Sequence, residues 1–516
     1  MGVDRHGSET YFVIGEGFLG EARGGRDVVA LPALAPTAAP VAAPPPFRFS
    51  RLGPKGAGKQ LGRPNRLKIA QAMTHDNLSP GQIPAGFTYL GQFIDHDLTF
   101  DKSSLMEGVD IPPATLLQAR SPSLDLDSLY GNGPADPGSA QFYAADGIHL
   151  KEGAAQGGPP GSDLPRKTSG PNIGEAIIPD PRNDENLAVA QIHCAFIRFH
   201  NRVVDSLGAI PAPERFRAAR RRVTKHYQWM IRHDYLPRIC NSAIVTNVFT
   251  QGRKVFEVGA SPTSVPTMPI EFSVAAFRLG HSMIRATYSW NKIFPGATLA
   301  QLFEFTHLSG GLPGPIPDIW IADFRRLFDF SQLTPPNPAL VVPAAKFNKA
   351  MRIDSKLVNP LSTLPVADLA PENNLAFRNL LRANMVKLAT GQQMVTFLRS
   401  KGLTVNKLTK TQIKNGNGGA SLAGLNTTQR NALLDNTPLW FYILREAEFH
   451  QGKLHAVGAR ITSETFHRAI EGSQFSIVRD TNFHPVLGPN NTTFRMVDLL
   501  NFAFNGNAAL LNPNGN

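Results

Sequence analysis

The stretch Gly91–Phe100, GQFIDHDLTF, places a histidine between two aspartates within an otherwise apolar run. Its phenylalanines and its leucine are residues expected in a core, whereas Asp95, His96 and Asp97 are not, because an unpaired buried charge is strongly disfavoured. Histidine is also the side chain that takes up and returns a proton most readily near neutral pH. The segment therefore predicts bound groups that occupy the polar atoms of all three side chains.

Three further blocks contain polar residues that a plain hydrophobic core does not explain. Ser121–Gly131, SPSLDLDSLYG, places serine and aspartate side-chain oxygens at alternating positions. Pro179–Asn186 reads PDPRNDEN, and Phe277–Arg285 reads FRLGHSMIR with a polar partner in NLLR, Asn379–Arg382. The four blocks are far apart in the chain, so a site that uses them all requires a large folded domain.

The composition allows a domain of this size and limits the classes of partner that the chain could bind. The chain has 516 residues, 42% of them hydrophobic, and its 32 phenylalanines predict a Phe-rich core. The net charge is +12, but the basic residues are scattered, and the one dense run, Arg215–Arg222, is typical of a solvated helix face. We therefore expect no nucleic-acid binding. Excess positive charge can instead hold or attract anionic ligands and substrates.

The cysteines and the N-terminal region exclude several classes of protein. Cys194 and Cys240 both lie in apolar, helix-like contexts, which predicts buried free thiols and no disulfide framework. There is no CxxCH motif for a thioether-linked haem. The apolar run Tyr11–Leu19 is short and interrupted by Glu16, so we expect neither an ordinary signal peptide nor a membrane span.

The remaining pattern predicts a mainly α protein with one large domain, long loops and minimal β-structure. We expect residues 1–80 to form an N-terminal arm with an Ala/Pro-rich linker at 30–46, residues 81–470 to form the domain, and residues 471–516 to form a C-terminal extension packing on it. Residues 101–181 are rich in Gly, Pro and Ser, and 153–161 is expected to be a flexible loop.

Apolar residues at helical spacing predict the long helices of this domain. The clearest is Leu187–Leu207, with Asn183 or Asp184 as its N-cap. Lys254–Val258, KVFEV, is expected to form part of a small hairpin. The other predicted helices are Ala218–Ile244, Phe272–Thr287, Leu375–Ser400, Thr437–His450 and Ala459–Ala469.

Taken together, in this order, the four blocks resemble the animal-type haem peroxidase family, the peroxidase–cyclooxygenase superfamily. The resemblance covers roughly residues 85–470 and is nearest to a bacterial, peroxicin-like member. It implies a haem b group with His281 as the proximal iron ligand and Asn379 as the acceptor that holds the other ring nitrogen of His281. It also implies that Arg278 and Arg382 pair with the haem propionates.

On the distal side, the resemblance makes His96 the acid–base residue and Arg182 the cation that stabilises charge on the O–O bond. Gln92 matches a glutamine that holds distal water. Asp95 and Glu185 match the carboxylates that form ester links to haem in mammalian members. Simple hydrogen bonding without a covalent link stays open for both.

The resemblance also assigns the second block to calcium. Its ligands would be Asp97, Ser121, Ser123, Asp125 and Asp127, which leaves a solvated acidic turn as the alternative. Two positions depart from mammalian members. Asn186 stands where some carry a methionine bonded to the haem vinyl group, and Asp127 stands where they carry a serine. His193 and His200 are read as structural.

The function that the resemblance implies is a haem peroxidase. It would use hydrogen peroxide to oxidise phenols, aromatic amines, halides or thiocyanate through an oxoferryl intermediate. A fatty-acid dioxygenase of the same superfamily is an alternative. Those enzymes carry a radical tyrosine three residues before the proximal histidine, and this chain has Arg278 at that position. A catalytically silent haem-binding protein is a third reading. We expect a monomer that is secreted by a leaderless route rather than retained in the cytoplasm.

Overall fold

The computed structural model describes the chain at residues 11–13, 17–19, 47–58, 60–75, 78–101, 108–116, 118–364 and 371–516. The predicted Ala/Pro-rich linker at 30–46 lies outside the described residues. Over the described part the fold is mainly α, with long connections and only short two-stranded ribbons, which confirms the predicted fold class. In that part, no helix is long and apolar enough to cross a membrane.

The longer helices carry most of the architecture. They are α1 (Arg63–Met73), α2 (Gly86–Leu98), α4 (Leu187–Ser206), α5 (Ala212–Met230), α7 (Ser242–Gln251), α10 (Leu299–Glu304), α12 (Leu375–Met385), α13 (Gly391–Ser400), α14 (Lys410–Asn415), α15 (Thr427–Asp435), α16 (Leu439–Glu448), α17 (Ala456–Glu471) and α18 (Met496–Ala503). The one-turn helices are α3 (Asp127–Tyr130), α6 (Leu236–Ile239), α8 (Ile270–Ser273), α9 (Gly280–Met283), α11 (His307–Gly310) and α19 (Ala508–Leu511).

The strands form two-stranded ribbons that tie distant segments together. The antiparallel pairs are β1 (Tyr11–Val13) with β2 (Gly17–Leu19), β5 (Pro80–Pro84) with β11 (Lys349–Met351), β6 (Gly153–Ala154) with β7 (Pro160–Asp163), and β9 (Thr287–Tyr288) with β10 (Ala297–Thr298). The parallel pairs are β3 (Phe49–Ser50) with β8 (Met268–Pro269) and β4 (Thr74–His75) with β12 (Leu357–Val358).

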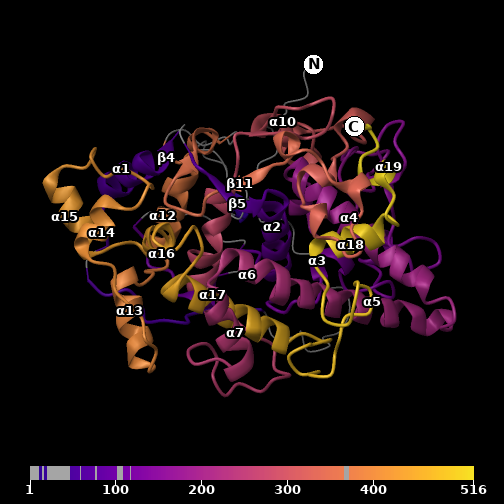
Figure 1. Cartoon of the computed structure of the whole chain (residues 1–516). Coiled ribbons are helices and arrows are strands. Elements are labelled where there is room, and N and C mark those ends of the chain that lie inside the picture. The colour runs from indigo at the N-terminus through magenta and orange to yellow at the C-terminus, as the bar shows by residue number, and fades with distance from the viewer. Residues whose placement is uncertain are drawn as a thin grey trace.

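Helix α2 lies near the middle of the molecule, with α4, α5 and α18 to one side of it and α12 and α16 to the other (Figure 1). Every residue of α2 except Asp95 is buried. Phe93 stacks on Phe196 of α4, with ring centroids 4.5 Å apart. Gln92 and His96 are four residues apart, so they share one face of the helix. The core therefore fixes the direction in which both polar side chains point.

Helix α4 confirms the strongest helix prediction, but its cap differs from the expectation. The side chain of Asn186 accepts a hydrogen bond from the backbone N–H of Val189, so Asn186 is the N-cap. Asn183 and Asp184 are engaged elsewhere, Asn183 with two histidines and Asp184 with Arg166. The predicted cap was therefore wrong by two or three residues.

The predicted helix Ala218–Ile244 is interrupted. Helix α5 continues into a π-helical turn, η4 (Ile231–Tyr235), which leads into α6. Pro237 supplies no backbone N–H and its ring crowds the preceding turn, and the wider π turn accommodates this. Asn241 then caps α7 by accepting from the N–H of Ile244, so a new helix starts there.

The predicted helix Phe272–Thr287 is also wrong as a continuous element. It consists of α8, a 3-10 turn η5 (Ala276–Leu279) and α9, and it ends in β9. Phe272 and Phe277 stack with ring centroids 4.6 Å apart, and both contact Phe466 of α17. Residues five apart do not share a face of a regular α-helix. Burial of this aromatic cluster thus overrides helix propensity.

Two smaller predictions fail for local reasons. Leu375–Ser400 splits into α12 and α13 because Thr390 forms a capping box with Gln393 and starts a second helix. Lys254–Val258 forms no strand, because the Glu464 carboxylate accepts the backbone N–H groups of residues 254–256. Thr437–His450 and Ala459–Ala469 correspond to α16 and α17.

The segments that flank the domain are packed where they are described. β3 pairs with β8, and α1 packs on α12, while α18 packs on α4. The loop predicted at 153–161 is tied at both ends, because β6 pairs with β7. Cys194 and Cys240 are buried and free, as predicted. The proposed domain boundaries at residues 80 and 470 stay predictions.

Candidate active site

His96 is completely buried on α2 and has one engaged and one open ring nitrogen. Its Nδ1 lies 2.9 Å from Oδ1 of Asn183. Its Nε2 has no hydrogen-bond partner among the described residues, and Oε1 of Glu185 lies 4.0 Å away. Burial and the nearby positive charge of Arg182 lower the pKa of His96 to about 3. His96 is therefore a neutral imidazole at physiological pH.

Asn183 determines which nitrogen of His96 carries the proton. Its Nδ2–H donates to Nδ1 of His193 at 3.0 Å, which leaves Oδ1 facing His96. An amide oxygen only accepts, so Nδ1 of His96 carries the hydrogen and Nε2 keeps its lone pair. The 3-10 turn η3 (Pro181–Asp184) holds Asn183 in place against α4.

Arg182 is held tightly beside this histidine. Its Nε and Nη2 donate to the Asp180 carboxylate at 3.0 and 2.7 Å, and Nη2 also donates to the backbone carbonyl of His96 at 3.0 Å. Its guanidinium lies over the ring of Phe100. Arg120 also donates to Asp180, and the two arginines keep the pKa of Asp180 well below its usual range despite burial. The site therefore has a fixed cation.

A second polar network faces the same side of α2. Nε2 of Gln92 donates to Oε1 of Glu185, and Asn186 donates to Oε1 of Gln92 at 3.0 Å. Burial raises the pKa of Glu185 to about 8, so this carboxyl is protonated at neutral pH. Its Oε2 has no partner among the described residues. Asp95 is less buried and accepts from the Thr99 hydroxyl at 3.2 Å.

The second histidine of the predicted site lies on α9, which packs against α2. Nδ1 of His281 lies 2.8 Å from the side-chain amide of Asn379 on α12. The amide nitrogen faces the ring in this structure, and an iron-bound His281 requires the amide rotated so that its oxygen accepts from Nδ1–H. In either orientation the contact with Asn379 engages Nδ1 of His281.

The two predicted propionate arginines flank this histidine. Nε of Arg278 donates to the carbonyl of Ser273 at 2.8 Å. Nη1 of Arg382 lies 3.0 Å from Oδ2 of Asp101. Arg278 also acts on Asp95, since its charge partly offsets the rise in the pKa of that carboxyl that burial causes. The structure therefore brings a residue of the proximal set close to the distal helix.

Of the predicted calcium ligands, Asp125 and Asp127 lie close enough to Asp97 to act on its carboxyl group, but protein donors engage all three carboxylates. Asp97 is fully buried and accepts from the N–H groups of Leu126 and Ser128 at 3.2 Å. Asp125 accepts from Ser473, and Asp127 accepts from Arg220. Among the described residues, no group of three or more His, Cys, Asp or Glu side chains is arranged to hold a metal ion.

The same loop nevertheless concentrates negative charge. Burial and the neighbouring carboxylate of Asp127 raise the pKa of Asp97 to about 8, and burial and Asp125 raise the pKa of Asp127 to about 6. Ser121 and Ser123 lie in the same turn, where Oγ of Ser121 accepts from the N–H of Ser123 at 3.3 Å. The carboxylates lie close enough together to repel each other, and a cation would relieve that repulsion.

Comparison with known proteins shows what the chain is similar to. Residues 101–298 match the family model described as animal haem peroxidase. The resemblance to that family is confirmed. Human thyroid peroxidase is 31% identical over 170 residues, which cover 30% of this chain and 17% of the relative. A peroxidase-like protein of Margaritifera margaritifera is 31% identical over 121 residues, covering 23% of this chain and 15% of the relative.

Solved structures extend the likeness to most of the fold. Peroxidase A of Dictyostelium discoideum superposes with a TM-score of 0.59 at 16% identity, covering 90% of this chain and 94% of that one. A fatty acid alpha-dioxygenase of Oryza sativa also reaches 0.59 at 12% identity, covering 90% and 89%. The chain therefore shares the fold of these two enzymes over most of its length.

The buried polar atoms of this site are compatible with a bound haem group and a bound peroxide. An imidazole nitrogen and a carboxyl oxygen, His96 Nε2 and Glu185 Oε2, are buried without hydrogen-bond partners among the described residues. Such groups are costly unless a bound molecule satisfies them. On α9, the imidazole of His281, whose Nδ1 is engaged by Asn379, is a side chain of the type that binds haem iron.

Sequence reasoning missed Asn183, His193 and Asp180 as members of the site. Asp180 and Asn183 flank Arg182 in the block PDPRNDEN, so their position in that block was the available signal. His193 gave none, because its spacing on α4 is equally consistent with a core histidine. His200, which was read as structural, has both ring nitrogens engaged, by the Tyr130 hydroxyl and the Ile148 carbonyl.

Proposed function

We propose that this chain is a haem peroxidase that reduces hydrogen peroxide and oxidises small donors such as phenols, aromatic amines, halides or thiocyanate. The observation that carries the proposal is His96, a buried neutral imidazole whose Nε2 lone pair is open while its Nδ1 is fixed by Asn183. Haem, if bound, would supply redox-active iron for the reduction of peroxide.

The residues of this chain supply the proton transfers. Nε2 of His96 accepts a proton from one peroxide oxygen and returns it to the other, which then leaves as water. A neutral His96 can start this exchange at physiological pH, because its pKa is lowered to about 3. Asn183 keeps Nε2 free of its own hydrogen during the first transfer.

Arg182 supports the same step electrostatically. Its contacts with Asp180 and with the His96 carbonyl fix the guanidinium, so no reorganisation is needed when negative charge develops on the peroxide. Gln92, which is bonded to Glu185 and Asn186, is placed to hold water on this side. His281 would hold the iron through Nε2, and Arg278 and Arg382 would pair with the propionates.

Two finer features belong to the same proposal. Asp95 and Glu185 are the carboxyl groups that would carry ester links to haem, and Glu185 has an unpartnered buried oxygen. Calcium would bind at Asp97, Ser121, Ser123, Asp125 and Asp127. The concentration of buried carboxylates there favours a cation, although each carboxylate now accepts from protein donors.

A fatty-acid dioxygenase is the second candidate, because the alpha-dioxygenase of Oryza sativa shares the fold. Arg278, three residues before His281, disfavours it, since the superfamily's dioxygenases carry a tyrosine there. The two candidates separate in one experiment. The chain reconstituted with haem is mixed with peroxide and guaiacol or bromide, and separately with palmitate and dioxygen. Donor oxidation without oxygen consumption supports the peroxidase, and oxygen uptake with palmitate contradicts it.

A further inference from the structure

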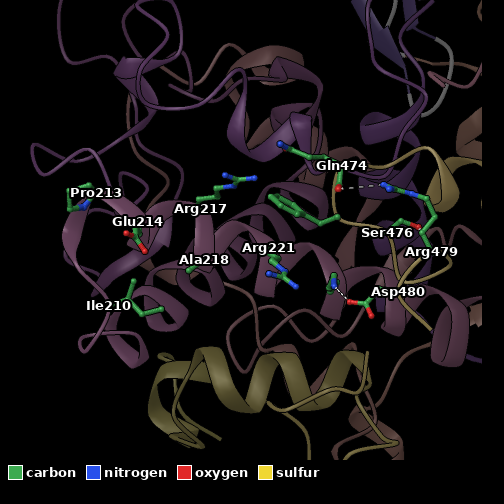
Figure 2. Close-up of a pocket in the computed structure, with 12 residues that line it drawn as sticks. Ile210, Pro213, Glu214, Arg217, Ala218, Arg221, Gln474, Ser476, Arg479 and Asp480 are labelled. Atoms are coloured by element: carbon green, nitrogen blue, oxygen red, sulfur yellow. Dashed lines mark hydrogen bonds and ion pairs between the residues drawn. The ribbon is translucent and has the colours of Figure 1, made fainter. Parts of the chain in front are cut away.

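A surface groove of about 870 Å³ lies between α5 and the segment that follows α17. Figure 2 shows Arg217 and Arg221 on the helix and Arg479 on the segment opposite. The residues that line it are Ile210, Pro213, Glu214, Arg217, Ala218, Arg221, Lys225, Gln474, Phe475, Ser476, Arg479 and Asp480. None of them belongs to the proposed peroxidase site.

The groove is positively charged. Four basic side chains line it, against two acidic ones. Lys225 and Asp480 neutralise each other in an ion pair. Arg217 and Arg221 are exposed, and no hydrogen bond or ion pair joins either of them to another described residue. Two guanidinium groups with all their donors available therefore face the groove.

The geometry of these arginines favours a ligand with more than one acidic group. Arg217 and Arg221 are four residues apart on α5, which places them on one face, about 6 Å apart at Cβ. On the opposite wall, Nε of Arg479 donates to the carbonyl of Glu471 at 2.8 Å, and Nη2 donates to that of Ser473. These bonds hold the third guanidinium in a fixed position. Arginine binds carboxylate and phosphate groups in a bidentate manner.

The groove also has an apolar part. Phe475 is half-buried in its wall, and Ile210, Pro213 and Ala218 line it on the side of α5. Its volume lies in the range of small-molecule sites, about 300–1,000 Å³. We propose that this groove binds a small organic anion that carries two or more carboxylate or phosphate groups on an aromatic or other apolar body.

Binding would also add a link between α5 and the segment opposite it. Gln474 donates its backbone N–H to Asp125 at 2.8 Å, and the Ser473 hydroxyl donates to the same oxygen at 2.5 Å. A ligand that bridges Arg221 and Arg479 holds residues 474–480 against the helix. Hydrogen exchange of the backbone amides in this segment should therefore slow when the ligand binds.

The test uses the full chain and benzene-1,3,5-tricarboxylate as the probe, titrated calorimetrically at low ionic strength. Arg221→Gln is compared with Arg222→Gln, which removes the same charge from the neighbouring residue outside the groove lining. We expect Arg221→Gln to weaken binding about tenfold, the loss of one charge-assisted contact, and Arg217→Gln/Arg221→Gln to abolish it. Arg222→Gln should bind within about twofold of the natural chain.

Further arms test the chemistry of the ligand. Benzoate, with one carboxylate, should bind much more weakly than the tricarboxylate. Phe475→Leu should weaken the tricarboxylate more than it weakens citrate, which has no ring. Slowed exchange at residues 474–480 would place the probe in the groove.

Three results would overturn the proposal. The first is an absence of saturable tricarboxylate binding at millimolar concentration. The second is equal weakening by Arg221→Gln and Arg222→Gln, which would indicate attraction to net charge alone. The third is binding of poly-glutamate without binding of the tricarboxylate, which would indicate a surface for an acidic polymer.

Discussion

Oδ1 of Asn183 lies 2.9 Å from Nδ1 of His96, and both side chains are completely buried. The contact joins the 3-10 turn that carries Arg182 to the helix that carries His96, the proposed distal histidine. Because Asn183 also donates to His193, its amide is held in one orientation. The tautomer of His96 therefore depends on Asn183 and His193 as well as on His96 itself.

The first prediction concerns that amide. Asn183→Leu keeps the approximate volume but leaves Nδ1 of His96 without a partner, so the ring can rotate or change tautomer. We expect the rate constant for reaction with hydrogen peroxide to fall at least about tenfold, which is a partial loss of the roughly 10²- to 10⁴-fold that general acid–base catalysis contributes. Stopped-flow absorption measures the rate, and the haem content of each sample is the control. An unchanged rate with full haem occupancy would show that Asn183 does not set the tautomer.

The second prediction concerns His96 itself. His96→Gln removes the nitrogen that accepts the proton and should slow the reaction with peroxide by about 10²- to 10⁴-fold. Haem binding should persist, because His281 lies on a different helix. The paired control is His200→Gln, which alters a histidine of α4 whose ring nitrogens are engaged by Tyr130 and Ile148. Equal rates for His96→Gln and the natural chain would contradict the assigned role.

The third prediction concerns the ester links. Glu185→Gln preserves a side chain that can bond with Gln92 but cannot form an ester. After turnover with peroxide, acid–acetone should extract a larger share of the pigment from Glu185→Gln than from the natural chain. Asp95→Asn tests the second position in the same way. If the pigment of the natural chain is fully extractable after turnover, the claim of covalent links fails.

The fourth prediction concerns calcium. A site occupied at one hundred times its dissociation constant stabilises the folded chain by about 2.7 kcal/mol. Chelation should therefore lower the thermal unfolding midpoint, and added calcium should restore it. Asp127→Asn should reduce the calcium-dependent part of the shift. A midpoint that is the same with chelator and with millimolar calcium would leave the carboxylates as a purely protein-bonded cluster.

The fifth prediction concerns stability and pH. Glu446 is buried and accepts from the backbone N–H of Val457 in the first turn of α17. Burial raises the pKa of Glu446 to about 8. The folded chain therefore holds this proton where the unfolded chain has lost it, so the contribution of Glu446 to stability is fully present below about pH 4.5 and is lost as the pH rises through 8.

Glu446→Gln removes this titration and should flatten the fall in the free energy of unfolding between pH 5 and pH 8.5. Between these two pH values, the free energy of unfolding should fall by a few kcal/mol more for the natural chain than for the variant, since one pKa unit corresponds to about 1.4 kcal/mol. Urea unfolding at both pH values measures it. Parallel pH dependences for the natural chain and the variant would show that Glu446 is already ionised in the fold.

Sequence patterns predicted the parts of this structure that depend on local spacing or on a family motif. Leu187–Ser206 is helical because its apolar residues recur at helical spacing, and the block around Arg182 lies beside His96 as the resemblance implied. The contact between Asn183 and His193 could not be predicted from the sequence. The two residues are ten positions apart, and they come into contact because the turn η3 folds back against α4. The break within Phe272–Thr287 depends on Phe466, nearly two hundred positions away.

The hydrogen bonds from Ser473 and Gln474 to Asp125 have a consequence for how the chain is made. Synthesis proceeds from the N-terminus, and the residues of the distal side, from Gln92 to His193, leave the ribosome long before residue 473. The loop around Asp125 can therefore gain these bonds only after residue 474 has emerged. Until then Asp125 lacks these two donors, so the loop completes its hydrogen bonds after the helix that carries His96 has been synthesised.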